Sequence, residues 1–265
     1  MNIIVCVKAV PGSTEVKMDP ATNTIVRDGG ASVINPFDAA ALEVALRLKD
    51  DAVRQGLPCR VAVLSMGIPT TAELLRDCIA RGADDALLLS DRDFAGADTL
   101  ATTYALACGV RRLGGADLVL CGKLAVDGDT AQIGPELAGA LDAPCIAGVT
   151  EVLEVASGRV CARREVDGGA AVAEAPLPAV LTVSKDAAQL RMASIAGVMA
   201  AEGARIEVLS ARQAGADPAR IGRAGSPTQV VRSFVPKADA SGIPIEGSVD
   251  EQADAVAALL KEMGI

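Results

Sequence analysis

The chemistry open to this sequence is limited first by a missing side chain, because none of its 265 residues is histidine. Serine–histidine and cysteine–histidine nucleophile pairs are therefore excluded, and so are metal sites with histidine ligands. Proton transfer would fall to Asp, Glu, Lys, Tyr or Cys side chains, or to a bound cofactor.

The segment best suited to binding a ligand is Gly122–Gln132, which follows an apolar run and leads into a helical pattern. A glycine-containing loop before a helix presents free backbone N–H groups that suit a phosphate or pyrophosphate. Thr130 and Gln132 add donors, and Asp127 and Asp129 could cap the helix or accept hydrogen bonds from ribose hydroxyls. The segment is not a Walker A motif and the chain has no G-x-G-x-x-G, so an ordinary capped Asp-Gly turn explains it equally well.

Short apolar runs alternate with helical patterns through the first half of the chain. The runs are almost continuously apolar, which is typical of strands buried on both faces; they are Ile3–Val7, Arg60–Ser65, Ala86–Leu89 and Leu118–Cys121. Helices are expected from Pro36 to about Gly56, from about Thr70 to Arg81, from about Asp98 to Leu113, and from near Asp129–Gln132 onward. This alternation predicts an α/β fold, with a mostly parallel Rossmann-like sheet covered by helices on both faces.

The first helix has a clear start signal in Asn35-Pro36-Phe37-Asp38. Asn35 can cap, Pro36 suits the first turn, and Asp38 favours the positive end of the helix dipole. Its inward stripe is expected to contain Leu42, Ala45, Leu46 and Val53.

The pattern changes in the second half. Residues 149–175 alternate like a small antiparallel β ribbon, and Ala179–Ser184 returns as a buried strand. A C-terminal helix over Val249–Met263 carries an apolar face of Ala253, Val256, Leu259 and Leu260. We therefore expect an α/β nucleotide-binding domain over residues 1–205, and a C-terminal arm with a helix over 206–265 that packs on a partner.

Ligands of open α/β sheets bind beyond the carboxyl ends of the strands. The segments at that position are Lys8–Gly12, Met66–Pro69, Ser90–Thr99 and Gly122–Gln132. Lys8 and Lys123 both follow strands, and each could face a phosphate or lie solvated on the surface.

Composition excludes other functions. Aromatic residues make up 2% and the net charge is −9, which opposes nucleic-acid binding. The seven cysteines form no C-x-x-C pair, which is typical of reduced thiols in a cytoplasmic protein. The N-terminus lacks the pattern of a signal peptide, and no apolar run reaches the length of a membrane span, so we expect no direct membrane insertion.

Several ordered segments together resemble one family, the electron-transfer flavoprotein beta subunits. They are V-x-V-K-x-V-P at Val5–Pro11, N-P-F-D-x-x-A-L-E-x-A-L-x-L-K at Asn35–Lys49, G-K-x-A-x-D-G-D-T-A-Q at Gly122–Gln132, R-E-V-D-G-G at Arg164–Gly169 and L-P-A-V-L-T-V at Leu177–Val183. The resemblance implies a heterodimer with an FAD-bearing alpha subunit, and a nucleotide in the beta subunit itself.

The nucleotide implied is AMP in housekeeping members and a second FAD in the electron-bifurcating, nitrogen-fixation-linked branch. The features similar to the second branch are Ala97–Thr102, Asp127–Thr130 and Gly225–Val230, since housekeeping members carry a bulkier, more acidic loop at Gly128 and Thr130. By resemblance, the nucleotide would be held by Ala9, Asn35, Pro36, Phe37, Asp38, Met66, Gly122, Lys123, Leu124, Ala125, Val126, Asp127, Gly128, Asp129, Thr130, Ala131, Gln132 and Ile133. The segment with Ser90, Asp98 and Thr99 would lie beside the isoalloxazine ring of FAD.

In that branch NADH delivers a hydride to the beta-subunit flavin, one electron passes to ferredoxin or flavodoxin, and the other passes through the alpha-subunit FAD to a dehydrogenase. Redox activity is then expected only in the assembled complex. Residues 186–204 resemble the loop that recognises dehydrogenases, with Ile195 as apolar anchor or as an ordinary packing residue. The Lys-rich run that often follows is replaced by Ala200–Arg205, so the partner need not be the usual acyl-CoA dehydrogenase.

Two other functions compete with the bifurcating interpretation. One is the housekeeping subunit with structural AMP. The other is a nucleotide-binding sensor of the stress-protein kind, which would need neither the β ribbon nor the terminal helix. An ATP-using ligase or pyrophosphatase is disfavoured because no Ser-Gly-Gly loop follows the first strand.

Overall fold

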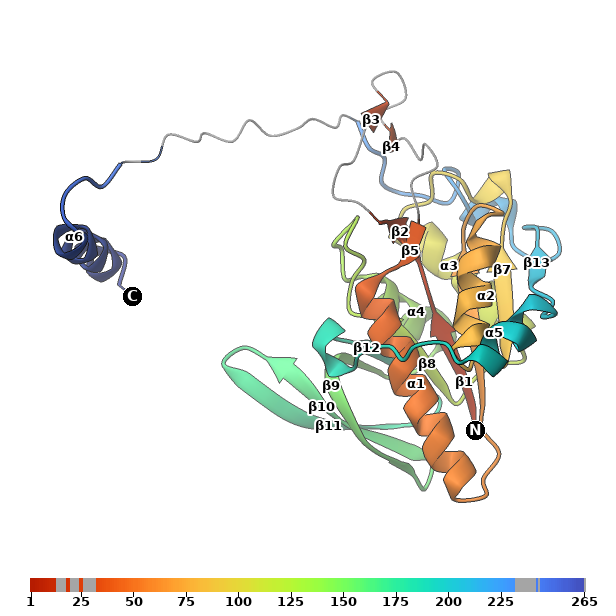
Figure 1. Cartoon of the computed structure of the whole chain (residues 1–265). Helices are drawn as coiled ribbons and strands as arrows, with labels where there is room; N and C mark the ends of the chain where they lie inside the picture. The colour runs from red at the N-terminus through yellow and green to blue at the C-terminus, as the bar shows by residue number, and fades with distance from the viewer. Residues whose placement is uncertain (13–17, 20–23, 26–31, 232–241, 243, 265) are drawn as a thin grey trace. The chain divides into compact units, whose positions relative to one another are not determined.

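A nine-stranded sheet organises the larger part of the chain (Figure 1). The computed structural model describes residues 1–12, 18–19, 24–25, 32–231, 242 and 244–264. Contacts divide the chain into two units, Met1–Val230 and Val231–Ile265.

The sheet has the order β11-β10-β9-β12-β8-β1-β6-β7-β13. Its parallel core consists of β1 (Asn2–Cys6), β6 (Arg60–Met66), β7 (Asp85–Leu89), β8 (Leu118–Gly122), β12 (Ala179–Val183) and the short edge strand β13 (Glu207–Leu209). All four strands expected in the first half are confirmed, and so is the mostly parallel α/β fold.

Two apolar layers hold helices against the faces of this sheet. Ile3 and Val5 of β1 face the layer that contains α1 (Pro36–Arg54) and α2 (Thr71–Ala80). Ile4 and Cys6 face the other layer, under α3 (Thr99–Arg112) and α4 (Ile133–Leu141). Alternate residues of one strand thus serve opposite faces, which explains why the strands are apolar throughout.

Helix α1 differs from expectation in two details. Asn35 occupies the N-cap position, but its side chain makes no capping hydrogen bond, because that amide is used elsewhere. Val53 is 61% exposed and therefore not part of the inward stripe, which holds Leu42, Ala45 and Leu46. The helix ends where Gly56 takes a positive φ of 71°.

Helix α4 starts later than its sequence suggests. Asp129 and Ala131 have positive φ angles of 49° and 54°, which keep residues 129–132 out of the helix, so α4 begins at Ile133. Gln132 is the N-cap residue, so neither Asp127 nor Asp129 caps this helix.

The β ribbon is confirmed and is continuous with the main sheet. It consists of β9 (Cys145–Ala156), β10 (Arg159–Val166) and β11 (Gly169–Pro176), joined antiparallel. The first part of β9 pairs parallel with β12.

Smaller elements are β2 (Ala9–Pro11) paired with β5 (Ser32–Ile34), β3 (Met18–Asp19) paired with β4 (Thr24–Ile25), the short helices η1 (Arg92–Phe94), η2 (Lys185–Ala187) and η3 (Pro218–Arg220), and α5 (Ile195–Glu202).

The second unit contains α6 (Val249–Glu262), which opens with a capping box between Ser248 and Glu251. The side chains of Val256, Leu259 and Leu260 are 45%, 49% and 42% exposed, so the expected apolar face exists and is uncovered among the described residues. No helix in the described part of the chain is long and apolar enough to cross a membrane.

Two glycines of α4 give a test of the packing. A Cβ atom at Gly134 would lie 2.1 Å from Cγ2 of Thr182, whereas one at Gly139 would meet no atom within 4 Å. Thr182 is held by a 2.9 Å hydrogen bond from the Gly148 N–H, so it cannot move away easily. Gly134→Ala is expected to lower the free energy of unfolding by about 1–3 kcal/mol. Gly139→Ala should raise it by about 0.5–1 kcal/mol through helix propensity. Urea unfolding of both variants measures the difference, and equal effects would contradict the close packing of α4 on β12.

Candidate nucleotide-binding site

The carboxyl ends of β8, β1, β6 and β7 lie along one edge, since these neighbouring strands are parallel. The chain runs from β1 outward through β6 to β7, and then crosses to β8 on the other side of β1. The edge therefore has a topological switch point between β1 and β8, which is where such sheets bind ligands.

Asp38 lies at this switch point, on the first turn of α1. Its Oδ2 accepts a hydrogen bond from the Lys8 backbone N–H at 2.8 Å, and its Oδ1 accepts one from the Gly122 N–H at 3.0 Å. Burial raises the pKa of this carboxyl group to about 7, although hydrogen bonds with Lys8, Asn35 and Gly122 act in the lowering direction.

Asn35 joins the same first turn to the loop after β8. Its Nδ2 donates to the Leu124 carbonyl at 2.8 Å, and its Oδ1 accepts from the Val126 N–H at 3.2 Å. Its own N–H donates to the Lys8 carbonyl at 2.9 Å. The side chain is fully buried, so both its donor and its acceptor need partners. The link between the two loops satisfies both.

The loop over residues 125–132 then turns outward. The Gly128 and Asp129 N–H groups both donate to the Ala125 carbonyl. Within the described residues, the backbone N–H groups of Thr130, Ala131 and Gln132 have no intramolecular acceptor, and all three residues are exposed. A run of open N–H groups beside the start of α4 is the arrangement that binds phosphate.

The two lysines of this edge differ in their partners. Lys8 Nζ lies 2.5 Å from Asp127 Oδ1, which keeps a positive charge beside the loop. Lys123 Nζ lies 2.7 Å from Glu165 on β10, and this hydrogen bond lowers the pKa of Glu165. Lys123 therefore ties the loop to the ribbon, whereas Lys8 contacts the loop itself through Asp127.

A second cluster forms around Asp98, in the segment after β7. Asp98 Oδ1 caps α3 through the Ala101 N–H, and Oδ2 accepts from the N–H and hydroxyl of Thr228. The Ser226 hydroxyl accepts from the Asp98 N–H at 2.8 Å. Burial acts to raise the pKa of Asp98, but these donors outweigh it and lower the pKa. The motif at Gly225–Val230 is thereby brought onto the segment from Ser90 to Thr99.

Other expected site residues lie between these clusters with less specific contacts. Ala9 pairs with Ile34 in the β2–β5 sheet, and Met66 ends β6 half-buried. Ser90 donates its N–H to the Leu209 carbonyl, and the Thr99 hydroxyl donates to Glu136 on α4. Pro36 and Phe37 form the first turn of α1, and the Phe37 side chain lies against Gly122.

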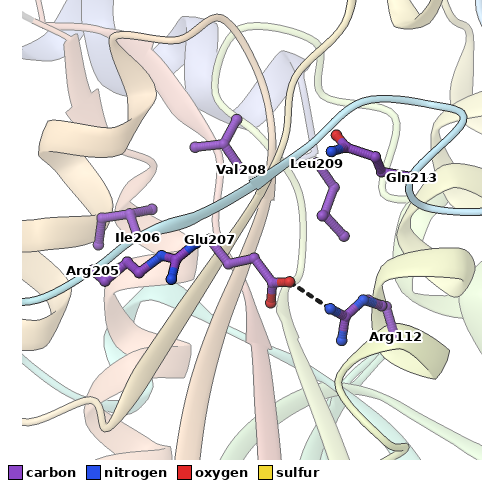
Figure 2. A pocket seen from close by; sticks show the side chains of 7 residues that line it. All are labelled: Arg112, Arg205, Ile206, Glu207, Val208, Leu209 and Gln213. Atoms are coloured by element: carbon purple, nitrogen blue, oxygen red, sulfur yellow. Dashed lines mark hydrogen bonds and ion pairs between the residues drawn. The ribbon is translucent and has the colours of Figure 1, made fainter.

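Two hollows of the described surface lie outside the Gly122–Gln132 loop. One of about 380 Å³ follows β13 (Figure 2), where Arg112 and Glu207 pair at 2.6 Å. Another of about 400 Å³ lies between the first turn of α1 and residues 185–190. Neither contains the open N–H groups, so an exposed loop and not a closed cavity forms the candidate phosphate site.

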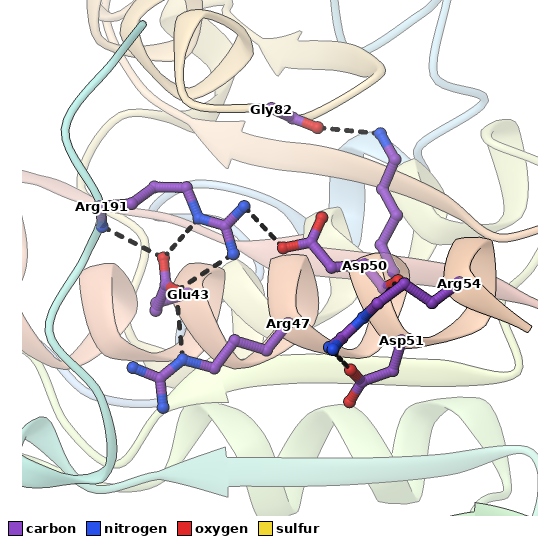
Figure 3. Close-up of polar contacts among 8 residues, drawn as sticks. Glu43, Arg47, Asp50, Asp51, Arg54, Gly82 and Arg191 are labelled. Atoms are coloured by element: carbon purple, nitrogen blue, oxygen red, sulfur yellow. Dashed lines mark hydrogen bonds and ion pairs between the residues drawn. The ribbon is translucent and has the colours of Figure 1, made fainter.

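The segment expected to recognise a protein partner is fastened to α1 by Arg191 (Figure 3). Its guanidinium pairs with Glu43 at 2.9 Å and with Asp50 at 2.8 Å, and its N–H donates to Glu43 at 3.1 Å. Burial acts to raise the pKa of Glu43, but hydrogen bonds from Arg191 and Arg47 outweigh it and lower the pKa. Arg81 also donates to the Arg191 carbonyl. Sequence reasoning missed this cluster, because a pair 148 positions apart leaves no local pattern.

Beyond Arg191 the chain exposes large apolar side chains. Met192 is 85% exposed, Ile195 84% and Met199 68%. Ser194 caps α5, and Gly197 lies against the Ala80 carbonyl so closely that a Cβ atom would be 2.1 Å from it. Ile195 is thus exposed at the start of a helix that is held from beneath, and it does not pack in the core of the described residues.

Comparisons with known proteins give one consistent family. Residues 22–214 match the model of the electron transfer flavoprotein domain. The chain is 42% identical to the caffeyl-CoA reductase-Etf complex subunit CarD of Acetobacterium woodii over the whole of both chains. It is 42% identical to an electron transfer flavoprotein subunit beta of Megasphaera elsdenii, over 95% of this chain and 94% of the relative. Protein FixA of Bradyrhizobium diazoefficiens is also 42% identical, over 97% of this chain and 90% of the relative.

The contact between Gly122 and the first turn of α1 can be tested by substitution. A Cβ atom at Gly122 would lie 2.4 Å from Asp38 Oδ1 and 2.6 Å from Phe37 Cβ, whereas one at Gly128 would meet nothing within 4 Å. Gly122→Ala is expected to cost about 1–3 kcal/mol of stability through overpacking. Gly128→Ala, in the same loop, should change stability by less than about 0.5 kcal/mol. Thermal unfolding of the two variants decides, and a stable Gly122→Ala protein would disprove the contact.

The buried Asp38 carboxyl group predicts a pH dependence of stability. Its folded-state pKa of about 7 stands above the value of 3.8 for an unperturbed group, so the folded protein binds this proton more tightly than the unfolded chain. Stability should therefore fall as the pH rises towards 7 and level off above it, by on the order of 1–3 kcal/mol between pH 5 and 8. Glu43 and Asp98 have lowered pKa values and act below this window. Urea unfolding across the range should show the slope in the wild type and lose it in Asp38→Asn; equal slopes would rule Asp38 out as its source.

Proposed function

The chain belongs to the electron transfer flavoprotein family, as a beta subunit of a heterodimer with an alpha subunit, and on that premise we propose that it binds FAD at the carboxyl edge of its sheet and takes part in electron bifurcation. The observation that carries the proposal is the run of open N–H groups at Thr130, Ala131 and Gln132, beside Lys8 and the start of α4. This arrangement fits the pyrophosphate of a dinucleotide.

The choice of FAD over AMP is supported by ordered segments at two places along the carboxyl edge of the sheet, after β8 and after β7. Open space surrounds Gly128, where nothing lies within 4 Å of an added Cβ atom. The Asp98 cluster adds a second ordered segment at the end of β7, two strands from β1, fastened by Ser226 and Thr228. A mononucleotide would need only the loop after β8. The flavin ring of FAD would extend further along the edge, to the Asp98 segment. AMP remains the alternative ligand.

Bound FAD would supply the redox chemistry, with NADH as the proposed hydride donor. The part of this chain is to bind and orient: Lys8 would offset phosphate charge, and the Asp98 segment would position the ring. No side chain at the edge needs to act as acid or base, which fits a chain without histidine. The proposed acceptors are ferredoxin or flavodoxin and, through the alpha-subunit FAD, a dehydrogenase or reductase.

Similarity to relatives supports the choice of partner. The name of the Acetobacterium woodii relative describes a complex between a caffeyl-CoA reductase and an electron transfer flavoprotein. We propose that a related acyl-CoA enzyme docks on Ile195 and its exposed apolar neighbours. The uncovered face of α6 is proposed to pack on the alpha subunit.

The proposed cofactor is tested by co-purifying this chain with its alpha subunit, denaturing the complex and quantifying released nucleotides. We expect about two molecules of FAD per heterodimer and no AMP. Thr130→Trp should lose most of the beta-subunit FAD, because the indole would fill the space outside the loop. Gln55→Trp, at the far end of α1, should keep it. Equal amounts of FAD and AMP would identify the housekeeping type.

A further inference from the structure

The strands β1 and β8 separate at the candidate site. Their last paired residues are Val5 and Leu120. Beyond that pair, the Val7 N–H donates to the Leu64 carbonyl of β6, and the Lys123 N–H donates to the Val183 carbonyl of β12. Each strand thus continues with its outer neighbour, and the main-chain groups between them no longer bond to each other.

Asp38 bridges this gap. Its two carboxyl oxygens accept the Lys8 and Gly122 N–H groups, one from each side of the split. The residue is only 7% exposed, and Gly122 lies so close that a Cβ atom there would be 2.4 Å from Oδ1. Each oxygen thus already accepts a main-chain N–H group, and little of the side chain is left exposed above the edge.

We propose that Asp38 is a positioning residue: without touching the nucleotide, its carboxyl group fixes the separation of the β1 and β8 ends, and with it the loop that binds phosphate. The inference rests on the proposed function and alters the role expected for Asp38, from contact to support. Asn35 holds the far side of the same loop through Leu124 and Val126.

The groups around Asp38 determine its response to a bound anion. The charged and titratable groups that interact with Asp38 are Lys8, which follows β1 and pairs with Asp127, and the thiols of Cys121 on β8 and Cys78 on α2. Burial raises the pKa of Asp38 to about 7 and that of Cys78 to about 12, and a hydrogen bond with Cys6, together with burial, raises the pKa of Cys121, so the thiols stay neutral. A phosphate bound near Lys8 opposes negative charge at Asp38, so binding is accompanied by proton uptake there.

The test uses the complex with the alpha subunit, stripped of the beta-site nucleotide, and measures the Kd for FAD from pH 6 to 8. FAD is chosen because its pyrophosphate does not titrate in this range. In the wild type the affinity should fall as the pH rises through 7. Asp38→Asn should weaken FAD binding about tenfold, because an amide oxygen can accept only one of the two N–H groups at this geometry and the NH2 faces the other. It should also remove the pH dependence.

Asp117→Asn is the matched control. Asp117 Oδ2 accepts the Asn2 N–H at 2.7 Å, so it joins the same two strands at the opposite edge of the sheet. This variant should lose stability while keeping the FAD affinity within about twofold and the wild-type pH profile. If Asp38→Asn kept both the affinity and the pH profile of the wild type, the positioning role would be overturned.

A second measurement does not need the variant to fold. Calorimetry of FAD binding to the wild type at pH 7, in buffers with different heats of ionisation, should show net proton uptake, and its absence would overturn the proton coupling at Asp38. If the wild-type complex holds AMP, the same titrations are made with AMP. The phosphate of AMP itself titrates in this pH range, so the Asp38→Asn variant supplies the baseline for that contribution. A wild type that binds neither nucleotide would refute the proposed function itself, and the inference with it.

Discussion

The structure depends on how a parallel sheet is held together where its chain changes direction. Outward crossovers from β1 to β6 and from β8 through α4 to β9 leave β1 and β8 as neighbours whose ends diverge. Main-chain hydrogen bonds cannot close such a split, because each strand end already pairs with its outer neighbour. A short acceptor with two oxygens can close it, and Asp38 is placed to do so by the first turn of α1. Burying that carboxyl group is costly, which its raised pKa reflects.

The same helix connects the two candidate surfaces of the chain. Asp38 and Asn35 lie at its start, beside the candidate nucleotide loop, and Glu43 and Asp50 follow on the same helix, where Arg191 fastens the exposed apolar segment. Glu43 is almost fully buried, so removing Arg191 would leave an uncompensated charge. A single helix thus carries residues that contact both the candidate nucleotide loop and the exposed apolar segment.

Much of this arrangement could be predicted from the sequence. The buried strands were visible as apolar runs such as Leu118–Cys121, and the helix starting at Pro36 followed from its proline and from the stripe of Leu42 and Leu46. The order of segments around the nucleotide loop led to the family, which the comparisons confirm. The side-chain roles were less accessible. Asn35 reads as a helix cap in sequence because its competing partners, Leu124 and Val126, lie about 90 positions away. The late start of α4 had no local signal either, since positive φ angles at Asp129 and Ala131 are imposed by the loop.

The division between what was predicted and what was missed has a physical origin. Apolar periodicity reports which face of an element is buried, and that information is local to the element. Polar side chains at the edge are different, because each has several acceptors or donors within reach and only the folded chain selects among them. The Asp98 carboxylate illustrates this: it could have capped α3 alone, but it also holds Thr228, and its N–H holds Ser226. The edge of the sheet is therefore built by polar side chains that each join two segments. Substituting one of them is therefore expected to displace a loop as well as to remove a contact.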